Sequence, residues 1–157
     1  MRLEIGDGER LLPLKPLSGR RIEVYGDSVS AGEVSEAVDF VGKKDLVHNG
    51  GYSNSWYSYA WITARKLKAQ IHDIAQGGIA LMDGIGWFQE PNQIGMESVW
   101  DKAIDEVVDN MNDKMITHYV YGRNGFGTPG HLRIPEACEI ATELAEYIEG
   151  LEIEGWN

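Results

Sequence analysis

Two short apolar runs on either side of a helical pattern constrain the fold of this chain more than any other feature. The runs cover residues 21–25 and 70–75, and each is followed directly or within two positions by glycine. Between them, residues 56–69 carry apolar side chains at helical spacing, and Ser55 is suited to cap such a helix. Strand, helix and strand joined by short links indicate a parallel βαβ unit, which predicts an α/β fold.

The second half of the chain continues this alternation. We expect a helix over residues 96–110, a third strand over residues 114–121 and a helix that starts near Pro135 and ends near Gly150. One face of the last helix carries six apolar side chains: Ile134, Ala137, Ile140, Ala141, Leu144 and Ile148. The neighbours of Cys138, the single cysteine, predict a buried helical thiol.

The length of 157 residues suits one domain with a core. We expect residues 20–157 to form this domain and residues 1–19 to be a linker with the remnant strand of a preceding domain. No apolar run approaches membrane-spanning length, so no contact with a membrane is expected. The first ten residues carry charge where a signal peptide would have its apolar core, and the sequence leaves the localisation open.

The net charge of −11 argues against nucleic acid as a partner, because phosphates would be repelled and no basic cluster offsets the charge. Histidines and carboxylates do not occur at metal-ligand spacing, so no metal site is expected. The glycines lack the lysine and spacing of a phosphate loop, and no cofactor is implied.

Three chemically useful groups follow three predicted strands. Ser28 lies just past the first strand, Gly78 just past the second, and His131 after the third and before the last helix. In open α/β sheets, side chains and helix N-termini converge at the carboxyl ends of the strands. A serine hydroxyl becomes a nucleophile when a histidine takes its proton, so this convergence favours a Ser28–His131 pair.

Each of these signals also has a simpler interpretation. Gly-Asp-Ser is a common turn sequence, a Gly-Gly pair after a strand is often only a turn, and a single histidine before a helix is often a cap or a surface residue. His72 and His118 alternate within strands and are interpreted as structural, whereas His48 has no evident partner. The catalytic interpretation therefore depends on the three strand ends taken together.

Three blocks of sequence resemble a known family. GDSVSAGE resembles the first block of the SGNH, or GDSL-type, hydrolases. RRIEVYGDSVSAGE, SNSWYSYAWITARKLKAQIHDIAQGGIAL and GTPGHLRIPEACEIATELAEYI, taken in order, resemble the family-two carbohydrate esterases, which remove acetyl groups from xylan and other sugars. The resemblance covers most of residues 20–150 and implies a three-layer, parallel-sheet SGNH-hydrolase-like domain.

Carried over to this chain, the resemblance implies Ser28 as the nucleophile and His131 as its general base. It also implies the backbone amides of Ser28 and Gly78 as donors to the oxyanion. An aspartate commonly lies three positions before the histidine in this superfamily, and that position is Thr128 here. Some family-two esterases orient the histidine through a backbone carbonyl, so no third member of a triad is assigned. Asp27 is expected to serve the turn.

Two departures from the family pattern stand out. Family members usually carry a β-sandwich domain first, and residues 1–14 resemble only its last strand and linker. The block Gly-x-Asn-Asp, whose asparagine donates to the oxyanion, is missing. Near residues 99–106 the sequence passes directly from the region after the second block to the region before the last strand, and a central segment of the family pattern is absent. Asn124 imitates the missing asparagine from a different block and is kept as a candidate donor. A parallel sheet without its central strands must be covered, so we expect a homo-oligomer or an exchange of elements between copies.

The sequence thus predicts a serine esterase that removes acetyl groups from carbohydrate, possessing reduced activity because one oxyanion donor is missing. Trp87, Phe88 and Trp56 are candidates for flat surfaces on which a sugar ring packs, although Trp56 fits the helix core equally well. One alternative is a carbohydrate-binding or assembly module that kept the fold and lost the chemistry. Another is a lipid-type GDSL esterase, which would prefer longer acyl chains.

Overall fold

The computed structural model describes residues 8, 10, 13, 16–47, 49–88, 92–99, 131–151, 153 and 156. Within these ranges the elements follow in the order β1 (Arg21–Gly26), α1 (Ser28–Ala31), two 3₁₀ turns (Val38–Phe40 and Ser55–Tyr57), α2 (Tyr59–Lys66), β2 (Gln70–Ala75), α3 (Met96–Val99) and α5 (Ile134–Glu149). The predicted helix over 96–110 is described only as far as Val99, and the predicted third strand over 114–121 lies outside the described residues.

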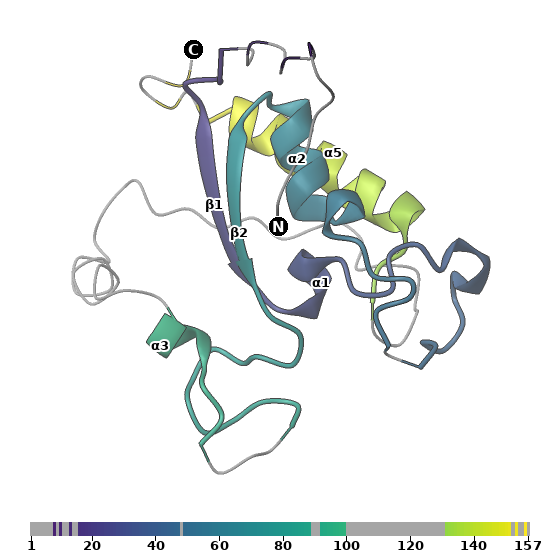
Figure 1. Ribbon diagram of the computed structural model, residues 1–157. Coiled ribbons are helices and arrows are strands. Elements are labelled where there is room, and N and C mark those ends of the chain that lie inside the picture. Colours follow the sequence, from purple (N-terminus) through teal and green to yellow (C-terminus); the bar gives the residue numbers. More distant parts are fainter. Residues whose placement is uncertain are drawn as a thin grey trace.

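The strands β1 and β2 are parallel neighbours, as the sequence predicts. Their register runs from Arg21 opposite Gln70 to Gly26 opposite Ala75, so both strands end at the same edge of the sheet. Figure 1 shows the two strands side by side, with the chain passing from the end of β1 into α1 and returning through α2. This βαβ arrangement brings the segments after Gly26 and after Ala75 together.

The helix α2 begins three residues later than predicted. Residues Ser55–Tyr57 form a 3₁₀ turn, and the N-cap is Ser58, whose hydroxyl accepts a hydrogen bond from Trp61 N at 3.4 Å. The expectation that Ser55 caps the helix was wrong, because Ser58 has extended backbone angles that interrupt the helix at that point. Of the predicted apolar face, Ala60, Thr63 and Leu67 are below 9% exposed, whereas Trp56 is 50% exposed. Ile62 and Ala64 are buried as well.

The last helix matches its prediction closely. Pro135 lies in the first turn of α5, and Gly150 follows its last residue. The buried residues of α5 are Glu136, Ala137, Ile140, Ala141 and Ala145. Cys138, expected to be buried, is exposed instead. It follows Ala137 by one residue, about 100° further round the helix, which turns it out of the face that packs against α2.

The core lies where α2 and α5 pack together. Ile62 of α2 contacts Ala137 and Ala141 of α5, and Tyr59 covers this cluster. Figure 1 shows α2 and α5 lying on the same side of the strand pair. The small side chains of α5 at this contact allow the two helices to approach closely. Among the described helices, none is long and apolar enough to cross a membrane.

Arg20 connects the start of β1 with the ends of α2 and α5. Its guanidinium group donates hydrogen bonds to Leu67 O at the end of α2 (3.0 Å) and to Trp156 O (2.6 Å). It also pairs with Glu149 at the end of α5, with 2.9 Å between Nη1 and Oε1. The start of β1 and the ends of both helices are therefore held together at the edge of the sheet remote from Ser28.

Candidate active site

The turn from β1 into α1 holds Ser28 as the first residue of a short helix. Asp27 is the N-cap, and its carboxylate accepts a hydrogen bond from Val29 N at 3.0 Å. Asp27 therefore serves the turn, as the sequence predicts. Gly26 is required by close packing, because a Cβ atom at this position would lie 2.6 Å from Ser30 Cβ. The strand thus turns into the helix immediately before Ser28.

The Gly-Gly pair after β2 lies beside Ser28. A Cβ atom added to Gly77 would be 3.8 Å from Ser28 Cβ and 3.0 Å from Oε2 of Glu33. Gly78 has a φ angle of +78°, and a Cβ atom there would be 2.6 Å from the ring of Phe88. The ends of the two strands therefore meet closely, and a side chain at residue 77 would fill the space between them, whereas one at residue 78 would meet Phe88.

Two backbone donors at these strand ends have no acceptor within the described part of the chain. Among the described residues, neither the N–H group of Ser28 nor that of Gly78 donates a hydrogen bond to a backbone or side-chain acceptor. Free backbone N–H groups beside a hydroxyl are the kind of donor that stabilises an oxyanion. They belong to the two residues from which the sequence predicts this role.

His131 precedes α5, and its imidazole is 13% exposed. Its Nε2 atom lies 3.6 Å from Oε2 of Glu33, the carboxylate that borders Gly77. Among the contacts of the described residues there is no hydrogen bond between His131 and the Ser28 hydroxyl. Glu33 instead connects the two sides of the site, since its own N–H donates to Ser28 O at 3.0 Å.

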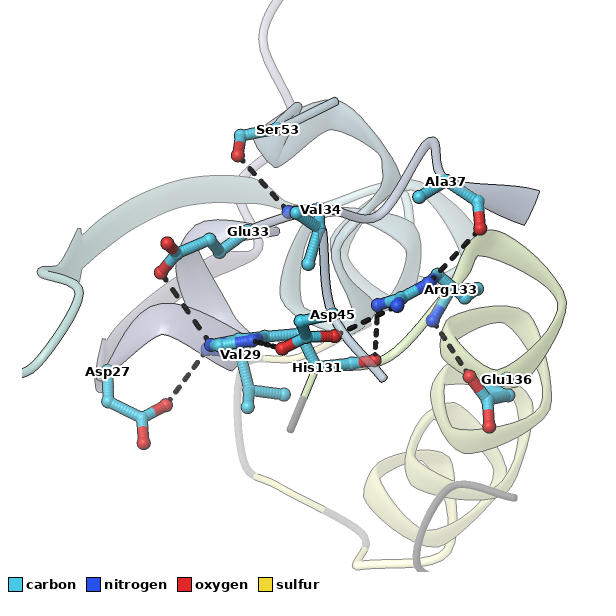
Figure 2. A network of polar contacts seen from close by, with 10 residues as sticks. All are labelled: Asp27, Val29, Glu33, Val34, Ala37, Asp45, Ser53, His131, Arg133 and Glu136. Atoms are coloured by element: carbon cyan, nitrogen blue, oxygen red, sulfur yellow. Dashed lines mark hydrogen bonds and ion pairs between the residues drawn. The ribbon is translucent and has the colours of Figure 1, made fainter. Parts of the chain in front are cut away.

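Asp45 is a member of the site that the sequence did not reveal. Its Oδ2 atom lies 2.6 Å from Nδ1 of His131, and its side chain is 11% exposed. Figure 2 shows the imidazole between two carboxylates, with Asp45 on one side and Glu33 on the other. Asp45 comes from an irregular segment 86 residues before His131, and no motif marks it.

Arg133 holds Asp45 in place and was also missed. Its side chain is completely buried and donates from Nη2 to Asp45 Oδ1 (2.8 Å), from Nη1 to His131 O (2.7 Å) and from Nε to Ala37 O (3.1 Å). Its backbone N–H donates to Glu136 Oε2 at 2.8 Å, which satisfies the start of α5. Figure 2 shows this network around Arg133.

The carboxyl group of Asp45 is kept ionised by its partners. Burial alone raises its pKa, but the hydrogen bonds with His131 and Arg133 and the nearby positive charge offset burial and lower the pKa below the ordinary aspartate value. An ionised carboxylate can only accept hydrogen bonds, so the proton in the contact with His131 belongs to Nδ1. When the imidazole is neutral, its lone pair is therefore on Nε2, on the side of Glu33.

The aromatic candidates occupy two different places. Trp87 and Phe88 are 80% and 60% exposed and lie next to Gly78, because Trp87 N donates to Gly78 O at 3.0 Å. Trp56 is 50% exposed, and the guanidinium of Arg65 covers one face of its ring at 4.0 Å. Trp56 is therefore not in the helix core. Asn124 lies outside the described residues. In the part of the chain that the structure describes, no cluster of three potential metal ligands occurs.

No family model matches this chain. Two curated proteins resemble part of it. The cellulase/esterase CelE of Acetivibrio thermocellus is 37% identical over 83 residues, which are 53% of this chain and 10% of that protein. The acetylxylan esterase/glucomannan deacetylase of Cellvibrio japonicus is 39% identical over 75 residues, 48% of this chain and 20% of that protein. The chain thus matches only a small part of the length of either relative.

A solved structure extends the likeness of the fold to nearly the whole chain. The structure of a family-two carbohydrate esterase from Clostridium thermocellum in complex with cellohexaose aligns with a TM-score of 0.60 and 21% identity, covering 97% of this chain and 69% of that one. The fold is therefore an α/β domain like that of this family-two carbohydrate esterase, in a shortened form. The resemblance to the family-two carbohydrate esterases, the acetyl xylan esterases among them, is confirmed by these comparisons.

Proposed function

We propose that this protein is a serine esterase that removes acetyl groups from carbohydrate. The observation that carries this proposal is the position of His131. Asp45 contacts its Nδ1 atom, and its Nε2 atom lies 3.6 Å from the carboxylate of Glu33, which borders Gly77 beside Ser28. A hydroxyl, an oriented imidazole and unused backbone donors are the parts that acyl transfer requires. The choice of acetyl esters of carbohydrate is supported by the names of the relatives, a cellulase/esterase and an acetylxylan esterase/glucomannan deacetylase.

In the first half of the reaction, Ser28 Oγ attacks the acetyl carbonyl carbon while His131 Nε2 takes the hydroxyl proton. In this step the Ser28 hydroxyl replaces Glu33 as the partner of Nε2. The backbone N–H groups of Ser28 and Gly78 donate to the oxyanion of the tetrahedral intermediate. The bond between the carbonyl carbon and the sugar oxygen then breaks, and His131 gives its proton to that oxygen, which leaves as the sugar hydroxyl.

The second half of the reaction returns the enzyme to its first state. Water attacks the carbonyl carbon of acetyl-Ser28, and His131 takes one proton from it. The intermediate collapses, the bond to Ser28 Oγ breaks, and His131 returns the proton to Oγ. Acetic acid is released and gives its proton to the solvent, which leaves acetate. The reaction consumes one water for each ester and needs no further reactant.

The substrate side of the proposal is supported by the exposed aromatic rings near Gly78. Trp87 and Phe88 present flat apolar surfaces next to the proposed oxyanion donors, and such surfaces can pack against the faces of a sugar ring. Trp56 is a weaker surface for this purpose, since Arg65 occupies one of its faces. We therefore assign the sugar contact first to Trp87 and Phe88.

The strength of the activity depends on the oxyanion donors. Removing one such donor from other enzymes lowers kcat by about a hundredfold to a thousandfold. The family's Gly-x-Asn-Asp block is missing from this sequence, so two backbone donors remain, with Asn124 as a candidate third. We expect kcat to be about a hundredfold lower than in an esterase with all three donors, unless Asn124 supplies the third donor.

The test is turnover of p-nitrophenyl acetate and of acetylated xylo-oligosaccharides by the purified chain. Ser28→Ala should abolish it, whereas the exposed Ser55 offers a matched control in Ser55→Ala. His131→Ala should also abolish turnover, and His72→Ala serves as its control because that imidazole is 79% exposed. The proposal fails if the wild-type chain shows neither turnover above background nor labelling by a serine-directed phosphonate probe.

The missing Gly-x-Asn-Asp block favours a second candidate function, a carbohydrate-binding or assembly module without catalysis. Such a module would bind acetylated xylo-oligosaccharide equally well before and after Ser28→Ala and would not release acetate. A lipid-type esterase would be recognised by higher turnover of p-nitrophenyl butyrate or octanoate than of the acetate. The acyl-chain profile therefore separates the two esterase classes.

A further inference from the structure

We propose that Asp45, fixed by Arg133, is the positioning residue that orients His131 for acyl transfer. This inference rests on the proposed esterase function and assigns the third member that the sequence leaves open. The superfamily places an aspartate three residues before the histidine, but that position is Thr128 in this chain. The carboxylate that contacts the imidazole comes instead from the segment between the 3₁₀ turn Val38–Phe40 and residue 48.

The contact has the geometry of a strong, charge-assisted hydrogen bond. Asp45 Oδ2 and His131 Nδ1 are 2.6 Å apart, and both side chains are almost buried, at 11% and 13% exposed. Little water can compete for either group. A carboxylate at Nδ1 fixes the tautomer and the rotation of the ring, and it stabilises the imidazolium that forms when Nε2 takes a proton.

Arg133 makes Asp45 a rigid partner. Its guanidinium group binds Asp45 Oδ1, which leaves Oδ2 for His131, and it also binds the backbone carbonyl of His131. The fully buried side chain of Arg133 therefore fixes both the carboxylate of Asp45 and the backbone of His131. The planar guanidinium can do this because its donors point in fixed directions, which a lysine ammonium does not provide.

The ion pair could also serve only to attach the irregular segment before residue 48 to the start of α5. Arg133 reaches Ala37 O, and Ile134 N donates to Ser35 O at 3.0 Å, so this attachment is real. The two roles differ in what Asp45→Asn changes. A structural link affects stability, whereas a positioning residue affects the imidazole tautomer and kcat in molecules that remain folded.

The experiment compares Asp45→Asn with Asp39→Asn, which alters an exposed aspartate on the neighbouring 3₁₀ turn. Turnover of p-nitrophenyl acetate is measured per folded molecule, with thermal unfolding as the measure of folding. We expect Asp45→Asn to lower kcat by about 10²–10⁴-fold with KM changed less than about threefold. Asp39→Asn should leave both constants unchanged. Normal kcat in a folded Asp45→Asn variant would overturn the proposal.

A second readout does not depend on turnover. In ¹⁵N-histidine-labelled protein, the His131 ring should show a protonated Nδ1, with its proton far downfield, and a lone pair on Nε2. The signal should disappear in Asp45→Asn and persist in Asp39→Asn. If the wild-type chain lacks esterase activity, the proposed function fails, but this spectrum still decides the present inference. A wild-type ring that is protonated at Nε2 alone would overturn it.

Discussion

The imidazole Nδ1 of His131 lies 2.6 Å from Oδ2 of Asp45, although 86 positions separate the two residues in the chain. The contact depends on Arg133, which is buried completely and binds the other oxygen of Asp45. This arrangement gives the start of α5 a fixed relation to the segment that follows the 3₁₀ turn Val38–Phe40.

Loss of Arg133 should destabilise the fold strongly. Arg133→Met removes the donor to Asp45 Oδ1 and to two backbone carbonyls, and we expect the free energy of unfolding to fall by about 3–5 kcal/mol. Urea denaturation measures this change, and Arg21→Met, at an exposed position, is the control. The double variant Arg133→Met/Asp45→Asn should lose less than the sum of the single changes. Additive losses would show that the two side chains do not stabilise one another.

Gly78→Ala should impair catalysis more than Gly84→Ala does. Both glycines have positive φ angles, of +78° and +75°, so both substitutions impose about 1–2 kcal/mol of backbone strain. Only at residue 78 does the added Cβ meet a neighbour, the ring of Phe88 at 2.6 Å. We expect Gly78→Ala to lower kcat by about tenfold to a hundredfold through displacement of the proposed oxyanion donor. Equal kcat values in the two variants would contradict this role.

Folding stability should depend on pH through Asp73. Burial raises the pKa of its carboxyl group to about 6, although a hydrogen bond from Trp61 opposes the change. One oxygen of this group is buried without a hydrogen-bond partner among the described residues. The folded chain then binds the proton more tightly than the unfolded chain, so stability falls as pH rises from about 4 to about 6 and stays lower above that range.

Asp73→Asn should remove this loss. We expect the variant to gain about 1 kcal/mol in the free energy of unfolding at pH 7, after allowance for solvent screening, and to gain little at pH 4. The pH dependence of stability that Asp45 contributes has the opposite sign. Because its pKa is lowered in the folded chain, its contribution is present at neutral pH and is lost only as pH falls below the ordinary aspartate range. Urea denaturation across this range, with Asp39→Asn as the control, measures the difference. A gain that is the same at every pH would contradict the prediction.

Trp87→Ala should weaken the use of sugar substrates without affecting the fold. The side chain is 80% exposed, so its removal costs little packing, and thermal unfolding should be unchanged. We expect KM for acetylated xylo-oligosaccharide to rise by about fivefold to fiftyfold while turnover of p-nitrophenyl acetate is retained. Trp56→Ala, at a ring already covered on one face by Arg65, is the comparison. A larger effect at Trp56 would reassign the sugar contact.

Self-association remains a prediction. Six large apolar side chains between residues 81 and 94 are more than half exposed: Leu81, Met82, Ile85, Trp87, Phe88 and Ile94. Exposed apolar groups gathered in one segment favour contact with another surface. We expect a homo-oligomer or an exchange of elements between copies in sedimentation velocity at micromolar concentration. A monodisperse monomer under these conditions would contradict it, and Ile94→Lys should favour the monomer if this segment forms the contact.

Much of the fold could be predicted because its signals are local. The strands end at a glycine or within two residues of one, and the face of α5 repeats every three to four residues, so both could be recognised within a few positions of sequence. Local signals also misled at two places. Ser55 and Ser58 are both suitable caps, and only the extended backbone at Ser58 decides between them. Cys138 has apolar neighbours but points away from α2, which the composition of the helix could not reveal.

The sequence by itself determined the βαβ order, the positions of Ser28 and Gly78 after the two strands, and the place of His131 at the start of the last helix. These follow from backbone preferences and side-chain periodicity, which act over a few residues. Only the tertiary structure decided which carboxylate faces the imidazole. Asp45 lies in an irregular segment without a motif, and it reaches His131 because Arg133 is buried between the two parts of the chain, at a separation of 88 residues from Asp45.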